Sequence, residues 1–115
     1  MAVPVVHGDL YAADLNPRFG TEPGNVRPVL VIQTDLLNET EHPSTWVIPC
    51  TTQVVGDNPL RVHLPKGIAG NSRECDIMID QSRTIDNRRL KRRIGSLPSP
   101  ILREVKTKLR QLGDL

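Results

Sequence analysis

Arg27-Pro28-Val29-Leu30-Val31-Ile32 is a nearly continuous apolar run, and it decides the fold class of this 115-residue chain. Apolar residues without polar alternation predict a β-strand that is buried on both of its faces. The run is too short to cross a membrane, which takes about 20 apolar residues. A loop with two glycines and a proline, residues 18–25, precedes the run, and the polar residues 35–44 after it are also predicted to be a loop.

Further short strands are predicted on both sides of this run. Residues 8–15 partly alternate between apolar and polar, and Asn16-Pro17 ends that strand. Pro49 indicates that the strand of residues 46–51 is an edge strand or carries a bulge. The remaining expected elements are strands at residues 60–64, 76–80 and 91–97, and a single helical turn at residues 85–90. Five or more short strands with tight turns favour a compact antiparallel barrel.

One helix is predicted at the C-terminal end, over residues 100–112. Its apolar residues recur at three- and four-residue spacing: Ile101, Leu102, Val105, Leu109 and Leu112. Ser99 is expected to be the N-cap, Pro100 suits the first helical position, and Gly113 is expected to be the C-cap. The sequence therefore predicts one domain, residues 1–115, that is a mainly β barrel with a C-terminal helix packed on it.

Charge is distributed unevenly along the chain. Residues 1–60 carry two Lys/Arg and seven Asp/Glu, a net of −5, whereas residues 61–115 carry thirteen and six, a net of +7. This asymmetry suggests a polyanionic partner for the second half. The basic run at residues 88–93 is either a solvated surface or a part of that binding surface. An aromatic content of 3% argues against RNA-binding modules that stack bases on several aromatic side chains.

Metal-ligand and thiol motifs are absent from the sequence. Cys50 and Cys75 share no Cys-x-x-Cys or Cys/His spacing and are expected to be free thiols, not catalytic nucleophiles. The three histidines fit no spacing for a metal or a catalytic triad, so no metal or cofactor is expected. Residues 1–7 lack the charged and apolar regions of a signal peptide, which favours a cytoplasmic protein that makes no membrane contact.

Six blocks of the sequence resemble the MazF/PemK/Kid family of type II toxin–antitoxin toxins. They are Gly8-Asp9-Leu10-Tyr11, Asp14-Leu15-Asn16-Pro17, Gly20-Thr21-Glu22, the run at residues 27–32, Val47-Ile48-Pro49-Cys50-Thr51-Thr52-Gln53, and Asp80-Gln81-Ser82-Arg83-Thr84-Ile85-Asp86 with Arg89-Leu90 after it. The blocks span essentially the whole chain, in the order and approximate spacing typical of the family.

The resemblance implies an SH3-like barrel of the CcdB/PemK-like toxin type that forms a two-fold homodimer. It implies an mRNA interferase, an endoribonuclease that cleaves single-stranded RNA at short sequence motifs without a metal. The products would carry 2′,3′-cyclic phosphate and 5′-hydroxyl ends. A cognate antitoxin is also implied, with a C-terminal segment that covers the RNA groove.

Arg27 and Thr51 are the catalytic residues that the resemblance implies. The planar guanidinium of Arg27 suits bidentate contact with phosphate oxygens, and its high pKa favours charge stabilisation over proton transfer. The Thr51 hydroxyl can donate to a non-bridging phosphate oxygen. Strand alternation predicts that Thr52 points away from Thr51.

Several further residues are candidates for catalysis or RNA binding. Glu22 could accept the 2′-hydroxyl proton or orient Arg27. Thr21 is a candidate from the block of Glu22, and Gln53 is a candidate from the block of Thr51. Asp80 matches an acid that acts in the Kid branch, but Thr21 and Met78 stand where that branch has a histidine and an arginine. Asp80 and Gln81 are therefore expected to contact bases or to support the groove.

Two other functions remain open from the sequence. One is a gyrase-poisoning toxin of the same fold, which would need a tryptophan near its C-terminus, whereas Trp46 is the only tryptophan here. The other is an RNA-binding barrel without catalysis, which the scarcity of aromatic residues disfavours. Residues 17–25 and 65–74 are the loops expected to set the cleaved RNA motif.

Overall fold

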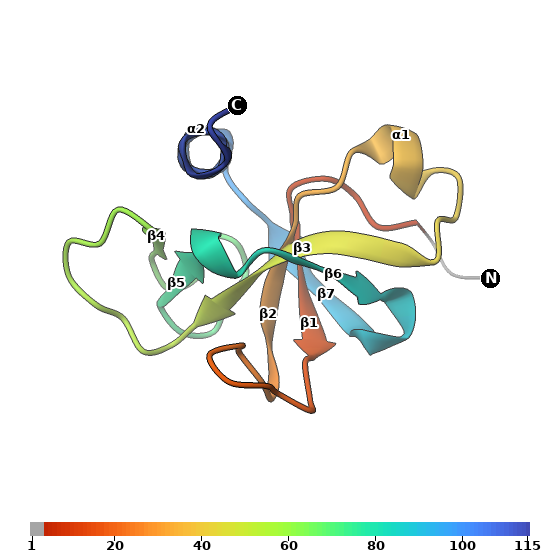
Figure 1. Ribbon diagram of the computed structural model, residues 1–115, viewed down its shortest axis with the longest axis horizontal. Helices are drawn as coiled ribbons and strands as arrows, with labels where there is room; N and C mark the ends of the chain where they lie inside the picture. The colour runs from red at the N-terminus through yellow and green to blue at the C-terminus, as the bar shows by residue number, and fades with distance from the viewer. Residues whose placement is uncertain (1–3) are drawn as a thin grey trace.

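A computed structural model describes residues 4–115, so the first three residues of the predicted 1–115 domain lie outside the described residues. Seven strands, two helices and two 3₁₀ turns follow one another along the chain (Figure 1). In order they are β1 (Asp9–Asp14), β2 (Val26–Val31), α1 (Asp35–Asn38), β3 (Ser44–Thr51), β4 (Arg61–Leu64), β5 (Cys75–Met78), η1 (Ile79–Gln81), β6 (Arg83–Asp86), η2 (Asn87–Arg89), β7 (Leu90–Ser96) and α2 (Ser99–Gly113).

The strands pair antiparallel in the order β4-β5-β3-β2-β1-β7, and β6 pairs with β3. β3 lies in the centre: one of its edges pairs with β2, and the other pairs first with β6 and then with β5. The bend that this change of partner requires turns the sheet into the barrel-like form that the sequence predicted. Figure 1 shows the strands crossing at β3, with α2 at one side.

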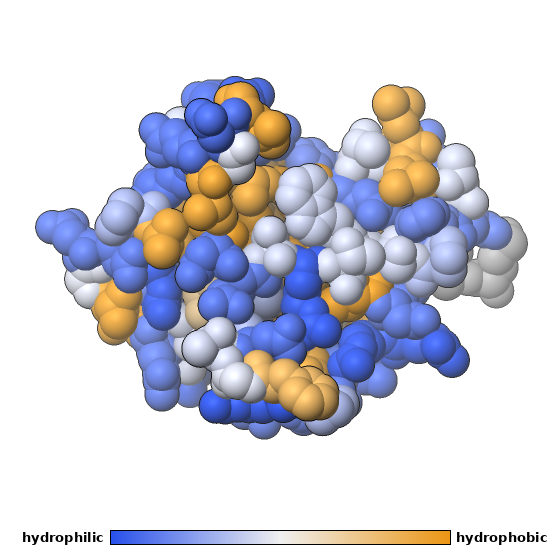
Figure 2. Space-filling view, viewed as in Figure 1, coloured by the Kyte–Doolittle hydropathy of each residue, from blue (hydrophilic) through white to orange (hydrophobic). Residues whose placement is uncertain are grey.

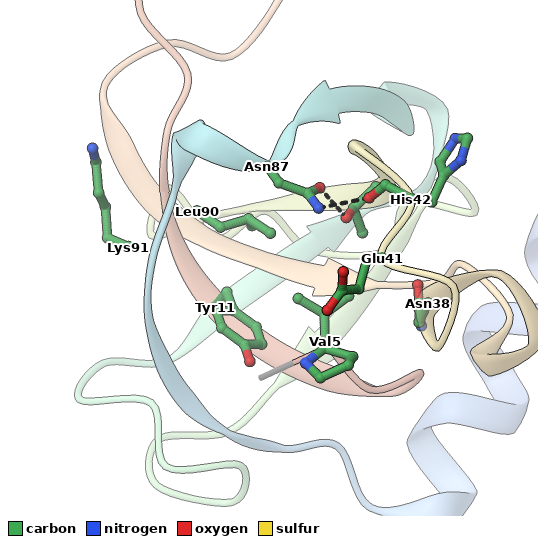
Figure 3. A pocket seen from close by; sticks show the side chains of 10 residues that line it. Val5, Tyr11, Asn38, Glu41, His42, Asn87, Leu90 and Lys91 are labelled. Carbon is green, nitrogen blue, oxygen red and sulfur yellow. Dashed lines mark hydrogen bonds between the residues drawn. The ribbon is translucent and has the colours of Figure 1, made fainter. Parts of the chain in front are cut away.

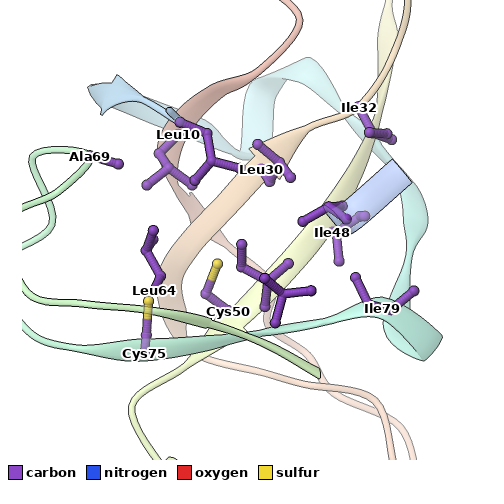
Figure 4. Packing of buried hydrophobic residues seen from close by; sticks show 13 residues of the cluster. Leu10, Leu30, Ile32, Ile48, Cys50, Leu64, Ala69, Cys75 and Ile79 are labelled. Atoms are coloured by element: carbon purple, nitrogen blue, oxygen red, sulfur yellow. The ribbon is translucent and has the colours of Figure 1, made fainter. Parts of the chain in front are cut away.

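Two apolar clusters lie on opposite faces of the central strands. Leu30 of β2 and Ile48 of β3 belong to the larger cluster (Figure 4). Val105 of α2 belongs to the same cluster. Val29 and Val47, one position away on the same strands, belong to the smaller cluster. β2 is therefore buried on both faces, as its apolar run predicted. Each such side chain contributes roughly 1.5–3 kcal/mol on burial.

Helix α2 occupies the predicted segment, but both of its ends differ from the prediction by one residue. Pro98 is the N-cap, without a side-chain capping hydrogen bond, and Ser99 is already helical. Pro98 suits this place because it has no N–H for the helix start to leave unsatisfied. At the other end Gly113 is still helical, and Asp114 is the left-handed C-cap with φ 55°. Among residues 4–115, no helix has the length and apolar character to span a membrane.

Three other expectations need correction. Residues 35–44 were expected to be a loop, yet Thr34 caps the short helix α1 through a hydrogen bond from the Leu36 amide. Residues 83–86 form β6, which the polar sequence did not predict, and the helical turn is only η2. Pro49 lies in the central strand and not in an edge strand. It falls between the β6-paired Val47 and the β5-paired Cys50, where its missing N–H is tolerated.

Candidate active site

Arg27 is held at the start of β2 by the backbone around it. Its Nε donates to the Gly24 carbonyl at 2.7 Å, and its Nη1 donates to the Cys50 carbonyl of β3 at 3.2 Å. These bonds fix the guanidinium between the loop before β2 and strand β3, and they leave Nη2 without a partner among residues 4–115. Partial burial, with nearby Arg18 adding to it, lowers the pKa of Arg27. A partly desolvated guanidinium interacts strongly with an anion, because less water has to be displaced.

Thr51 ends β3 directly after the carbonyl that accepts from Arg27. Its hydroxyl oxygen accepts a hydrogen bond from the Gln53 amide at 3.2 Å. Since that bond uses the acceptor side of the hydroxyl, its proton is available for another acceptor. Thr52, the residue after the end of β3, lines the same cavity as Thr51.

The loop before β2 carries Thr21 and Glu22, both exposed. Its two ends are tied together, because the Asn25 amide donates to the Asn16 side chain at 2.8 Å and the Leu15 amide donates to the Asn25 carbonyl at 2.9 Å. Gly24 has no room for a side chain, since a Cβ there would lie 2.9 Å from that of Arg18. The loop is therefore closely packed at Gly24, beside Arg27, whereas Glu22 is exposed to solvent.

One open cavity of about 590 Å³ brings these residues together. Five residues expected from the sequence line it, namely Thr21, Glu22, Arg27, Thr51 and Gln53. Three arginines that the sequence did not single out also line it: Arg18, Arg61 and Arg73. The concentration of positive charge against the single carboxylate of Glu22 favours an anionic ligand in this cavity. Only the net charge of residues 61–115 pointed to such a surface, and it could not say which arginines form it.

Asp80 and Gln81 lie away from that cavity in this chain. Both residues belong to η1, which contacts α2. Met78, the residue directly before η1, lines the cavity, but no residue of η1 does. The change from strand to 3₁₀ turn at Ile79 directs the chain toward α2 and away from Arg27.

The basic run does not form one continuous surface. Arg88 pairs with Asp86 at 3.0 Å, Arg93 pairs with Asp9 at 2.9 Å, and Arg89 donates to the carbonyls of residues 14 and 16. Arg92 alone reaches a smaller cavity of about 220 Å³ that Arg27 and Arg73 also line. Most of the run therefore serves local structure, and one member extends the positive charge of the site.

Comparison with known proteins agrees with this geometry. Residues 7–113 match the family model described as PemK-like, MazF-like toxin of type II toxin-antitoxin system. The chain belongs to this family. It is 39% identical over 102 residues to Endoribonuclease EndoA of Bacillus subtilis, covering 88% of this chain and 87% of that protein. It is 34% identical over 99 residues to Endoribonuclease MazF of Staphylococcus saprophyticus, covering 85% and 82%.

Solved structures of PemK/MazF-family toxins share the fold. The crystal structure of MazF from Deinococcus radiodurans superposes with a TM-score of 0.86 at 25% identity, over 99% of this chain and 100% of that chain. A MazE-MazF crystal structure from the same organism gives a TM-score of 0.79 at 28% identity, over 99% of both chains. The predicted barrel with a C-terminal helix is thereby confirmed.

The cysteines of this PemK/MazF-family chain are free and buried, as expected. A hydrogen bond with Cys75 and complete burial raise the pKa of the Cys50 thiol, which disfavours the thiolate that nucleophilic attack needs. Within residues 4–115, no three His, Cys, Asp or Glu side chains gather where they could hold a metal ion.

Another cavity, of about 420 Å³, is lined by none of the predicted site residues (Figure 3). Asn87 makes two hydrogen bonds to other residues that line this cavity: it donates to the His42 carbonyl at 2.8 Å and accepts from the Thr45 hydroxyl at 2.6 Å. These bonds connect η2 to the first part of β3 and to the segment before it. The side chains around this cavity therefore stabilise the join between those elements, whereas the arginine-lined cavity holds the groups suited to chemistry.

Proposed function

We propose that this chain is an endoribonuclease toxin that cleaves single-stranded RNA, chiefly mRNA, by attack of the ribose 2′-hydroxyl on the adjacent phosphate. The meeting of Arg27 and Thr51 in one cavity with three further arginines carries the proposal. Its family relatives are named endoribonucleases, which favours this activity over a gyrase poison or a binding module of the same fold. Loops 17–25 and 65–74 both contribute to the cavity, through Glu22 and Arg73 for example, which supports our proposal that they select the RNA motif.

The reaction makes three demands on the site. The 2′-hydroxyl must lose a proton, the pentavalent phosphorane must be stabilised, and the 5′-oxygen must gain a proton. Arg27 meets the second demand, because its Nη2 is unpaired within the described residues and its other nitrogens are fixed to the backbone. A donor positioned in advance stabilises the phosphorane without reorganisation during the reaction.

Thr51 and Glu22 supply further groups for the proposed chemistry, and the 5′-oxygen takes its proton from water in the open cavity. The Thr51 hydroxyl, oriented by the Gln53 amide, donates to a non-bridging phosphate oxygen. Glu22 is exposed on the loop opposite and either accepts the 2′-hydroxyl proton or orients Arg27. The products are a 2′,3′-cyclic phosphate and a 5′-hydroxyl. Asp80 and Gln81 contact RNA in this scheme only where it extends beyond the cavity.

The proposed partners follow from the positive charge of the cavity and from the solved structures of related toxins. One solved relative is a MazE-MazF complex, so we expect a cognate antitoxin to neutralise this chain in the cytoplasm. An acidic segment of that antitoxin would compete with RNA for the arginines of the cavity.

Cleavage of RNA in the presence of EDTA tests the proposed function. Purified protein should cut a mixed single-stranded RNA in excess EDTA, and polynucleotide kinase should label the 5′-hydroxyl ends without prior phosphatase treatment. A gyrase poison would leave the RNA unchanged on a denaturing gel, and a binding module would retard it on a native gel without cutting it. Cleavage that returns only with magnesium or zinc would refute the metal-free mechanism.

We also expect this chain to form a homodimer. Large apolar residues remain exposed on the single chain, and Figure 2 shows hydrophobic surface over α1 and beside α2. Leu36 is 81% exposed and Leu112 is 49% exposed. Covering such residues is favourable at roughly 25 cal/mol per Å², so a two-fold dimer should form at micromolar concentration. Sedimentation velocity checks this, and a monomer with full activity at that concentration would contradict it.

A further inference from the structure

Asp76 carries a buried carboxylate beside the site. It lies on β5 directly opposite Thr51 of β3, and the residue is only 1% exposed. Its Oδ2 accepts from Arg61 Nη1 at 3.3 Å and from the Val55 amide at 3.1 Å, and its Oδ1 lies 3.2 Å from His63 Nδ1. A buried carboxylate is costly unless it is paired and hydrogen-bonded, so these contacts determine where its partners lie.

Arg61 is the partner that reaches the cavity. It begins β4, and the same Nη1 that contacts Asp76 also donates to the Gln53 carbonyl at 3.1 Å. A guanidinium has five N–H donors, and the others of Arg61 have no partner among residues 4–115. Arg61 therefore presents a fixed, partly exposed fork to the cavity that it lines with Arg27.

The two residues also fix the backbone that follows Thr51. Gln53 is held through its carbonyl by Arg61, and Val55 is held through its amide by Asp76. Arg27 is anchored three residues earlier, on the carbonyl of Cys50. The two guanidinium groups are thus attached at successive points along one stretch of chain, and a ligand with regularly spaced anionic groups could contact both.

We propose that Arg61 is a second phosphate-binding residue for RNA, and that Asp76 is the positioning residue that holds it. The proposal rests on the proposed function, since it names a further contact to the same RNA. Arg27 faces the phosphate that is cleaved, and Arg61 binds another phosphate of the same strand. A bidentate arginine–phosphate contact needs the guanidinium held in plane, which the Asp76 carboxylate and the Gln53 carbonyl together provide.

Binding of an uncleavable RNA, with a 2′-deoxy group at the cleavage position, tests the role of Arg61. Arg61→Ala should weaken binding roughly 10-fold at low salt, because a charged hydrogen bond is lost. The slope of log affinity against log salt should fall by about 0.7, the value for one phosphate contact on a single strand. The single-turnover rate at saturating RNA should stay within about threefold, because the lost contact is equally strong in ground and transition states.

A double-mutant cycle tests whether Asp76 acts through Arg61. Asp76→Asn keeps the size of the side chain but removes its charge, and it should weaken RNA binding several-fold. In the Arg61→Ala background the same change should have almost no effect on binding. Arg61→Lys should keep the salt slope and recover only part of the affinity, because lysine keeps the charge but lacks the planar fork. Arg103→Ala, an exposed arginine of α2, is the matched control and should change neither quantity.

The outcomes separate this inference from the proposed function. Wild-type protein that neither binds nor cleaves RNA would refute the proposed function itself. Wild-type cleavage together with unchanged affinity and salt slope in Arg61→Ala would refute only the role of Arg61. If Asp76→Asn weakens binding equally with and without Arg61, Asp76 does not act as its positioning residue. Thermal melting identifies variants that fail to fold, and Arg61→Ala carries the test if Asp76→Asn does.

Discussion

Replacing Arg27 with alanine should slow RNA cleavage by on the order of 100- to 1000-fold, about 3–4 kcal/mol of transition-state stabilisation. The guanidinium is fixed by the carbonyls of Gly24 and Cys50 before RNA arrives, so its stabilising contact is ready for the charge that develops on the phosphorane. The affinity for uncleaved RNA should fall much less than the rate, because ground-state phosphate carries less concentrated charge. Single-turnover cleavage beside binding of the 2′-deoxy analogue measures both quantities.

Controls for Arg27 separate chemistry from folding and from general charge. Arg27→Lys should recover only part of the rate, since lysine lacks the planar fork. Arg88→Ala removes an exposed arginine that pairs with Asp86, and it should cleave at the wild-type rate. Arg27→Ala itself should remain folded and dimeric by circular dichroism and sedimentation. Near wild-type cleavage by Arg27→Ala at saturating RNA would mean that Arg27 only binds RNA.

A single 2′-deoxy substitution at the cleaved nucleotide should abolish cleavage at that position. The attacking group in the proposed reaction is the ribose hydroxyl, so removing it removes the nucleophile and leaves every contact of the protein with phosphate in place. The substituted RNA should therefore compete with unmodified RNA with nearly unchanged affinity. Cleavage of paired substrates, one substituted and one not, on a denaturing gel in EDTA measures the effect.

The matched control places the 2′-deoxy group two nucleotides away from the cleavage position. That substrate should be cut at close to the normal rate, because its nucleophile is intact. DNA of the same sequence should remain whole. Cutting at the substituted position would show that water or a protein group is the attacking nucleophile, and the proposed mechanism would then be wrong.

The spacing of apolar residues was enough to predict the strands and helices whose buried residues follow a regular pattern. The apolar run of β2 and the three- and four-residue spacing in α2 each follow directly from which faces are buried. Residues 83–86 gave no such signal, because Ile85 is the one fully buried residue of β6, whereas Arg83 is half-buried and Thr84 and Asp86 are exposed. β6 exists because the first half of β3 has an unpaired edge there, and pairing with it is a tertiary effect.

Some residues of the candidate site could likewise be predicted from the sequence, and others could not. Family resemblance led to Arg27, Thr51 and Glu22 because they stand in recognisable blocks, and the structure places all three at one cavity. Arg61 and Arg73 stand in no such block. They reach the cavity through strand pairing, because β4 pairs with β5 and β5 pairs with β3.

By itself the sequence determined the fold class, the family and the chemical types at the site, because apolar spacing and local motifs are written along the chain. The tertiary structure decided which charges act together. Arg88, Arg89 and Arg93 look like one basic surface in sequence, yet each finds a separate partner in the fold. Arg61 looks isolated in sequence, yet Asp76 holds it beside the Thr51 end of β3. Charge interactions depend on distance and burial in space, which strand pairing fixes and sequence order does not.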